Sequence, residues 1–205
     1  MVEMNEGLKS LAVANTELVD LVVDESRAAL LKDIAVNLPD ITLGERHLCD
    51  LELLATGGFS PLRGFMTRAD YEPVLDRMRL QDGSLWPLPI CLDVSEIKAR
   101  RLEAGQSAAL RDAEGFLLAV LHIEDIWPVD REREALRVYG TCDPSHPGAE
   151  YLLNRAGACY VGGKLEVVSL PLHFDFKKIR LSPAEIRSAA RKLNWKRMAG
   201  FVTEN

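Results

Sequence analysis

The sequence predicts an α+β fold, in which a small mixed or antiparallel β-barrel is packed with flanking helices and is followed by a helix and a strand of α/β character. Two observations predict it. Short apolar segments follow one another in the middle of the chain, whereas helical patterns gather near its start. After residue 171 the pattern changes to a helix leading straight into an apolar segment, which is the rhythm of an α/β sheet.

The composition is that of a globular protein without a nucleic-acid or membrane surface. Of the 205 residues, 47% are hydrophobic, and the net charge of −6 argues against the clustered Lys and Arg that nucleic acid requires. No apolar run approaches the roughly 18 residues of a membrane-spanning helix, and the N-terminus lacks the pattern of a secretory signal. We therefore expect a cytoplasmic protein that binds neither nucleic acid nor membranes.

The cysteines are isolated from one another in the sequence. Disulfide frameworks and zinc sites need Cys or His pairs at close spacing, and the nearest pair, His47-x-Cys49, has no second pair to complete it. We therefore expect reduced thiols and no metal site. The four cysteines are Cys49, Cys91, Cys142 and Cys159.

The first elements are a short strand and a helix. Residues 18–23 form an apolar strand-like run, and Ala28, Leu31 and Ala35 then recur at helical spacing until Pro39 helps to stop the helix. Two further helices are predicted. The first is "ERHLCDLELLATGG", residues 45–58, which ends in two glycines that accept a left-handed cap, and the second covers residues 70–78 and is followed by a turn at Asp82-Gly83.

Strands dominate the middle of the chain. Residues 85–94 contain prolines that suit an edge strand, and residues 107–129 contain two strands joined at "DAEG", the second of which, 116–126, is long and apolar enough to be central. We also predict strands at "ALRVYGT" (135–141) and "ACYVGGKLEVVSL" (158–170), separated by a Pro/Gly-rich loop and a short helix. The charged run "REREALR" (131–137) is interpreted as a solvated face.

The C-terminal part begins with a connector, "PLHFDFKKIR" (171–180). The following helix has clear start signals, because Ser182 is a good N-cap, Pro183 suits the first helical position and Glu185 completes a capping box. The apolar "RMAGFVT" (197–203) then predicts a strand. We therefore place a boundary near residues 171–180 and divide the chain into domains 1–172 and 173–205.

Two motifs invite a functional interpretation, and for each a structural one is favoured. "TGGFSPLRG" lacks the Lys and Ser/Thr that a phosphate-binding loop needs after its last glycine, so a turn that packs Phe59, Leu62 and Phe65 is favoured. In "CDPSHPG", Asp143 and His146 could form an acid/base pair, but a rigid loop is favoured. His122, in an apolar strand, is interpreted as a structural histidine, and residues 1–175 contain no complete catalytic set.

Several segments together resemble one family, the sulfate adenylyltransferases or ATP sulfurylases. The resemblance covers the chain from about residue 17, in the family's order. Its segments are "LCDLELLATGGFSPLRGFMTRADYEPVL", "LQDGSLWPLPICLDV", "TCDPSHPGAEYL", "YVGGKLEVV" and "RLSPAEIRSAARKLNWKRMAGFVTEN". It implies that the chain is the family's N-terminal domain, a PUA-like β-barrel with helices, followed by the first helix and strand of an α/β nucleotidyltransferase domain.

The resemblance also implies an activity that this segment lacks by itself. The family joins sulfate to ATP, giving adenosine 5′-phosphosulfate and pyrophosphate, and uses ATP with Mg in its next domain. No cofactor is therefore expected here. The expected partners are the missing catalytic domain, or a fused adenylylsulfate kinase domain, and further copies of the chain, since family members form dimers or hexamers.

The one site element of the family that the chain reaches is altered. Thr203 and Asn205 match a substrate-binding Gln-Thr-Arg-Asn motif, whereas Val202 replaces Gln and Glu204 replaces Arg. An arginine grips the sulfate dianion with paired hydrogen bonds, and a carboxylate repels it. At about 4 Å and an effective dielectric near 20, two unit charges interact by about 4 kcal/mol. We therefore predict that sulfate binding at this position is lost.

Three functional hypotheses follow. The chain is the N-terminal, non-catalytic domain of an ATP-sulfurylase-like protein. Alternatively, it is a decayed sulfurylase domain that acts as a scaffold or assembly module, for example for a fused kinase, and Val202 and Glu204 favour this alternative. An RNA-binding module is disfavoured because the net charge is negative and the basic runs are short.

Overall fold

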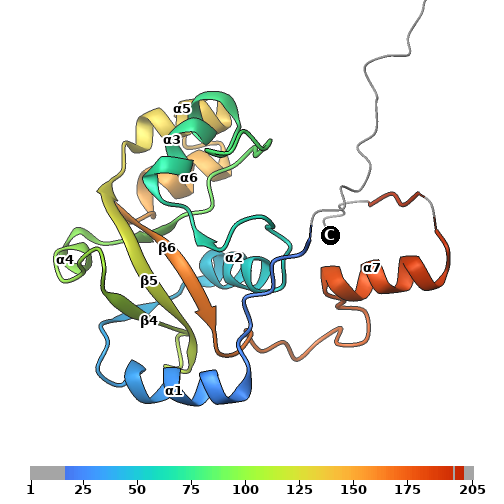
Figure 1. Cartoon of the computed structure of the whole chain (residues 1–205). Coiled ribbons are helices and arrows are strands. Elements are labelled where there is room, and N and C mark those ends of the chain that lie inside the picture. The colour runs from blue at the N-terminus through green and yellow to red at the C-terminus, as the bar shows by residue number, and fades with distance from the viewer. Residues whose placement is uncertain (1–16, 196, 201–205) are drawn as a thin grey trace, which may run out of the picture.

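A computed structural model describes residues 17–195 and 197–200, which form one mixed sheet with helices around it (Figure 1). In Figure 1, α3, α5 and α6 are grouped at one end of the long strands, α1 lies at the other end, and α7 stands apart. The helices are α1 (Glu25–Ala35), α2 (Glu45–Ala55), α3 (Arg68–Arg77), α4 (Glu96–Ala99), α5 (Arg131–Tyr139), α6 (Pro147–Asn154) and α7 (Pro183–Lys192). The strands are β1 (Asp40–Thr42), β2 (Gly64–Phe65), β3 (Leu92–Val94), β4 (Ser107–Arg111), β5 (Leu117–Pro128) and β6 (Cys159–Val167).

The sheet is open, so the predicted α+β class is confirmed but the barrel is not. Its order is β1-β4-β5-β6-β2, with β3 also paired to β6, and within the described residues no pairing joins β1 to β2 or β3. Among the paired strands of the described residues, β1 and β4 alone run parallel. The edge strands have two or three residues, which is too little ladder for the sheet to curl round and pair its two edges.

The central position of β5 is confirmed. It pairs with β4 on one side and β6 on the other, and its residues 118–121 are buried. The main core lies between this part of the sheet and the neighbouring helices, and its largest fully buried side chains include Leu51, Leu54, Phe65, Leu92, Leu110, Leu121 and Val161. Each such side chain stabilises the fold by roughly 1.5–3 kcal/mol relative to an exposed one.

The predicted helix signals are confirmed. In α1, Leu31 and Ala35 are buried, and in α7 both hydrogen bonds of the Ser182–Glu185 capping box form. After α2, Gly57 has a φ of +83°, and Gly83 has a φ of +88° in the predicted turn. A side chain at these φ values is strained, so the chain turns at these glycines.

Some predicted strands are wrong. Residues 135–139 belong to α5, which Asp130 caps and Gly140 ends with a φ of +72°. Residues 85–91 are not a strand, since only β3 forms in this segment, and the prolines there lack the N–H that a ladder needs. Residues 18–23 contribute only an isolated bridge, between Val22 and Val167.

The predicted C-terminal strand lies partly beyond the described residues. Residues 197–200 are not in a strand, and residues 201–203 lie outside the part that the structure describes. The division into domains 1–172 and 173–205 therefore stays a prediction. None of the helices in the described ranges is long and apolar enough to cross a membrane.

Candidate functional site

The site residues that the sequence predicts cannot be placed. Val202, Thr203, Glu204 and Asn205 lie outside the described residues. The loss of sulfate binding at this position therefore stays a prediction. The described chain instead offers one polar cavity beside the glycine-proline motif and three networks of charged side chains.

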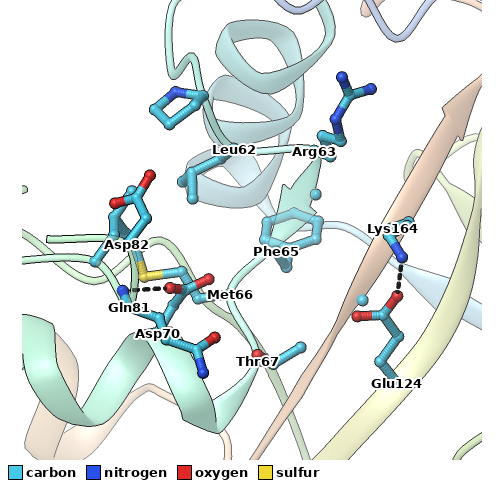
Figure 2. Close-up of a pocket in the computed structure, with 14 residues that line it drawn as sticks. Leu62, Arg63, Phe65, Met66, Thr67, Asp70, Gln81, Asp82, Glu124 and Lys164 are labelled. Carbon is cyan, nitrogen blue, oxygen red and sulfur yellow. Dashed lines mark hydrogen bonds and ion pairs between the residues drawn. The ribbon is translucent and has the colours of Figure 1, made fainter. Parts of the chain in front are cut away.

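The cavity has a volume of about 380 Å³ and opens beside β2 (Figure 2). Three segments surround it: the motif that contains β2, the loop after α3, and the adjoining parts of β5 and β6. The residues that line it are Pro61, Leu62, Arg63, Gly64, Phe65, Met66, Thr67, Asp70, Leu80, Gln81, Asp82, Glu124, Gly163 and Lys164.

The motif "TGGFSPLRG" serves the packing of β2 against β6. A Cβ on Gly64 would collide with the carbonyl oxygen of Gly163, and a Cβ on Gly162 would collide with that of Met66. Only glycine allows this close approach of two backbones. Leu62 and Phe65 are buried and Phe59 packs on the core, as the sequence predicted for a structural turn.

The charges around the cavity are mixed. Lys164 pairs with Glu124 at 2.8 Å, and the Oδ1 atom of Asp70 accepts a hydrogen bond from the backbone N–H of Gln81 at 2.9 Å (Figure 2). The backbone N–H of Ser84 hydrogen-bonds Asp82 and lowers the pKa of its carboxyl. The lining thus contains three carboxylates and only two cations, Arg63 and Lys164, and this charge balance disfavours the binding of phosphate or sulfate in the cavity. The lining pairs no nucleophile with a base, so the cavity can hold a polar group but contains no catalytic set.

The "CDPSHPG" loop is structural, as favoured from the sequence. The Nδ1 atom of His146 accepts a hydrogen bond from the N–H of Ala149 at 3.4 Å and caps α6. Asp143 accepts one from the N–H of Ser145. The ring of His146 lies 4.9 Å from that of Tyr139, so both candidate side chains have structural partners.

A buried ionic network joins the start of α2 to β3. The Oδ1 atom of Asp93 lies 2.8 Å from His47 Nε2 and 2.9 Å from an Arg46 nitrogen, and its Oδ2 accepts from the Gly157 N–H at 2.6 Å. Burial opposes ionisation of Asp93, but these hydrogen bonds and charges outweigh it and hold the pKa of the carboxyl well below its usual range. The sequence offered no signal for this network, because its members are far apart along the chain.

A second buried network corrects the solvated face predicted for residues 131–137. Glu134 is only 7% exposed and accepts hydrogen bonds from the hydroxyls of Tyr71 and Tyr160, at 2.8–3.0 Å. Burial raises the pKa of its carboxyl. The rings of Tyr71, Tyr160 and Trp127 have centroids 5.6–5.7 Å apart. Glu134 therefore fastens α5 to the sheet.

His122 is hydrogen-bonded, as expected of a structural histidine, but its side chain is half exposed. Its Nδ1 lies 3.0 Å from Ser107 Oγ and its Nε2 lies 2.6 Å from Glu166, which also accepts two hydrogen bonds from Arg27 at 2.7 and 2.8 Å. The hydrogen bond from Arg27, assisted by His122, lowers the pKa of Glu166 to about 2. This arrangement ties α1 to three strands.

The thiols and carboxylates show no metal centre. The four cysteines are free, and no group of three or more His, Cys, Asp or Glu side chains that could hold a metal ion occurs in ranges 17–195 and 197–200.

Comparison with known proteins decides the family. Residues 12–170 match the family of PUA-like domains. The chain belongs to the PUA-like domain family. The resemblance seen in the motifs is thereby confirmed for the fold, and the segment beyond residue 170 lies outside this match.

The curated relatives confirm the resemblance to the sulfate adenylyltransferases. The chain is 45% identical over 192 residues to the sulfate adenylyltransferase of Mycosarcoma maydis, which covers 92% of this chain and 33% of that protein. It is 45% identical over 177 residues to the one of Schizosaccharomyces pombe, covering 85% and 36%. The chain thus spans about a third of the length of the relatives it matches and corresponds to their N-terminal domain.

One solved structure has a related fold. It is described as a hexameric APS kinase from Thiobacillus denitrificans, is 34% identical in sequence and superimposes with a TM-score of 0.68. The match covers 87% of this chain and 31% of that one. The same domain therefore occurs in proteins with two different names, both much longer than this chain.

Proposed function

We propose that this chain is the N-terminal, non-catalytic domain of a protein of sulfate activation, and that it is inactive alone. In this family sulfate and ATP give adenosine 5′-phosphosulfate and pyrophosphate. The similarity to sulfate adenylyltransferases over about a third of their length supports the assignment. The described cavity and networks supply no nucleophile–base pair and no metal cluster, which supports a role in scaffolding and subunit contacts.

The observation that carries this proposal is an apolar surface beyond the PUA-like match. Phe174 and Leu172 are 85% and 76% exposed, whereas the apolar side chains in the core of the sheet are buried. Exposed apolar side chains gathered in one segment mark a surface that packs against another folded unit. The members of this C-terminal apolar surface are Leu172, Phe174, Phe176, Ile179, Leu181, Ile186, Leu193, Trp195 and Met198.

Helix α7 fits the start of such a unit. Its capping box and N-terminal Pro183 stabilise it locally, and within it only Ala190 is buried. A helix that buries so little of its surface gains little from its own domain. We propose that a following domain covers it, which agrees with a boundary near residues 171–180.

A second candidate function is that of a scaffold for an adenylylsulfate kinase. The structural neighbour described as a hexameric APS kinase favours it, because that chain carries the same fold in a protein about three times as long. The replacements at Val202 and Glu204 also favour it. On this hypothesis the chain assembles copies of itself and presents the kinase without contributing to sulfurylase chemistry.

A pyrophosphate-release assay with ATP, Mg²⁺ and sulfate tests the absence of activity. The chain should match a heat-inactivated control, and turnover above that control would contradict the proposal. The packing role has its own test in analytical ultracentrifugation. The double variant L172S/F174S should bind less of a fluorescent hydrophobic dye and self-associate less than the native chain, whereas L30S, which removes an exposed leucine from α1, should not. If L172S/F174S and L30S reduce dye binding and self-association equally, the C-terminal apolar surface has no special role in packing.

A further inference from the structure

We propose that Glu52, His173 and Arg180 form a proton-controlled clasp that fastens the connector to α2 in one of two mutually exclusive arrangements. The Nε2 atom of His173 lies 2.7 Å from Glu52 Oε2 and 3.3 Å from a terminal nitrogen of Arg180. Glu52 belongs to α2, while His173 and Arg180 stand at the two ends of the connector.

A single ring nitrogen cannot satisfy both neighbours. If Nε2 carries a proton it donates to the Glu52 carboxylate, and then it has no lone pair for the N–H of Arg180. If Nε2 is unprotonated it accepts from Arg180, and then its lone pair faces the lone pairs of the carboxylate. The two neutral tautomers of His173 therefore select different partners.

This clasp is the polar attachment of the connector to the rest of the described chain. The last backbone bonds to the sheet are those of Val168 and Ser169 to the carbonyl oxygen of Leu118. Between residues 171 and 181, the other hydrogen bonds in the described ranges are internal, from the N–H groups of Ile179 and Arg180 to Phe176. A change at His173 therefore acts on a segment that little else restrains.

The clasp also has room to rearrange. A cavity of about 380 Å³ lies between α2 and the start of α7, and Arg180 lines it. Besides Glu52, the ionisable groups that line the cavity are the Cys49 thiol on α2 and Glu185 on α7, whose carboxylate is occupied by the N–H and hydroxyl of Ser182 at 2.7 and 2.9 Å. Among the residues that the structure describes, no further cation lines the cavity, so a displaced guanidinium can enter it without facing a second positive charge from them.

Protonation decides between the arrangements. When Nε2 carries the proton, it donates to Glu52 and its N–H faces the N–H of Arg180, so this tautomer tightens the histidine–carboxylate contact and releases the guanidinium. Arg180 precedes the N-cap of α7 by two residues, so its release changes the attachment of α7. If the proposed function holds, the clasp sets how the C-terminal apolar surface meets the following domain.

Nuclear magnetic resonance of the histidine rings tests the clasp in the intact chain, which has only four histidines. Long-range ¹H–¹⁵N spectra report which ring nitrogen carries the proton. We expect R180M to favour the Nε2-protonated tautomer of His173 and E52M to favour the Nδ1-protonated one. The ratio of the two tautomers should differ by about fivefold between these variants, which corresponds to the energy of an exposed ion pair. Unchanged signals of His47 and His122 would show that each variant is folded.

The mechanical consequence has a second readout. The backbone amide signals of residues 180–185 should move when E52M is introduced into the native chain and should stay still when it is introduced into H173Q. The matched control is H146N, which removes an exposed histidine but keeps a side chain able to cap α6, and it should behave like the native chain. A His173 tautomer ratio unaffected by E52M and R180M, or amide shifts that persist in H173Q, would overturn the clasp. Neither readout depends on sulfate chemistry, so the clasp can fail while the proposed function stands, and the reverse.

Discussion

The imidazole of His47 and the carboxylate of Asp93 lie 46 positions apart in the sequence and 2.8 Å apart in space, with neither side chain more than 9% exposed. This contact joins the first turn of α2 to β3. Because Arg46 and the N–H of Gly157 share the same carboxylate, Asp93 holds a helix, a strand and the turn before β6 at one point.

Replacing this carboxylate should destabilise the fold. We expect D93N to lower the free energy of unfolding by about 2–3 kcal/mol, since it removes the buried charge that pairs with the partly exposed Arg46 guanidinium and leaves that guanidinium only the longer contact with Asp50. The pKa of Asp93 is lowered in the folded state, so its contribution is present above the ordinary aspartate range, near pH 4, and is lost as the pH falls further. Urea denaturation at pH 7 and at pH 3 measures both effects. The exposed D33N is the control, and an equal loss at both pH values would contradict the ionic interpretation.

The buried carboxyl of Glu134 should have the opposite dependence on pH. Its pKa is raised by burial, so the folded state holds the proton more tightly than the unfolded state. Stability from this group is therefore complete below the unfolded pKa, near 4.3, and declines as the pH rises through the folded value. We expect E134Q to flatten this decline between pH 4 and 7 in urea titrations, and the exposed E132Q to leave it intact.

The same position should show how much the tyrosine hydroxyls need their acceptor. E134A leaves two buried hydroxyls unpaired and should lower the free energy of unfolding by about 2–4 kcal/mol. The double variant Y71F/Y160F in the E134A background should recover part of the loss, because no hydroxyl then remains unsatisfied. If the triple variant Y71F/E134A/Y160F is less stable than E134A alone, packing of the tyrosines matters more here than their hydrogen bonds.

The close approach of β2 to β6 should not tolerate a side chain. In G64A the new Cβ would collide with the backbone of Gly163, which cannot yield as a flexible side chain can. We expect a loss of about 3 kcal/mol in the free energy of unfolding. G44A places its Cβ in open space at a residue with ordinary φ, so it is the matched control. If both variants unfold at the same urea concentration, the glycine in the motif has no packing role.

Sulfate binding should be absent even at millimolar concentration. Calorimetric titration of the chain with sulfate should give no heat beyond dilution, because Glu204 stands where the family has an arginine. Binding that disappears in E204A would contradict this prediction.

Local signals carried most of the successful predictions. Ser182, Pro183 and Glu185 are adjacent, and the start of α7 followed from them. The strand content was harder, because "ALRVY" alternates like a strand although Asp130 and Gly140 cap it as a helix. The caps Asp130 and Gly140, which lie outside the apolar run, favour a helix over this segment. The burial of Glu134 and Ala135 stabilises that helix against the alternating pattern of a strand.

The charged networks could not be predicted, for a physical reason. The partners of Asp93 and Glu134 come from segments separated by 26–64 positions, and one sequence does not tell which distant side chains meet. The run around Glu134 also has the composition of a solvated surface, so the sequence alone does not indicate that Glu134 is buried. Its burial is tolerated because the hydroxyls of Tyr71 and Tyr160, from distant segments, donate hydrogen bonds to its carboxylate. The barrel was overestimated because two of the strands predicted for it, at 18–23 and 135–141, are an isolated bridge and part of a helix, and because the short β1 and β2 were not predicted.

The capped start of α7 has a consequence for the speed and strength of docking. A ten-residue helix is marginal in water, and an N-cap contributes about 1 kcal/mol to it. A segment that already holds its helical shape loses less conformational entropy when a partner covers it. Within α7 the chain thus presents the exposed Ile186 on a preorganised helix, so association at this point needs to order little more than the side chain itself.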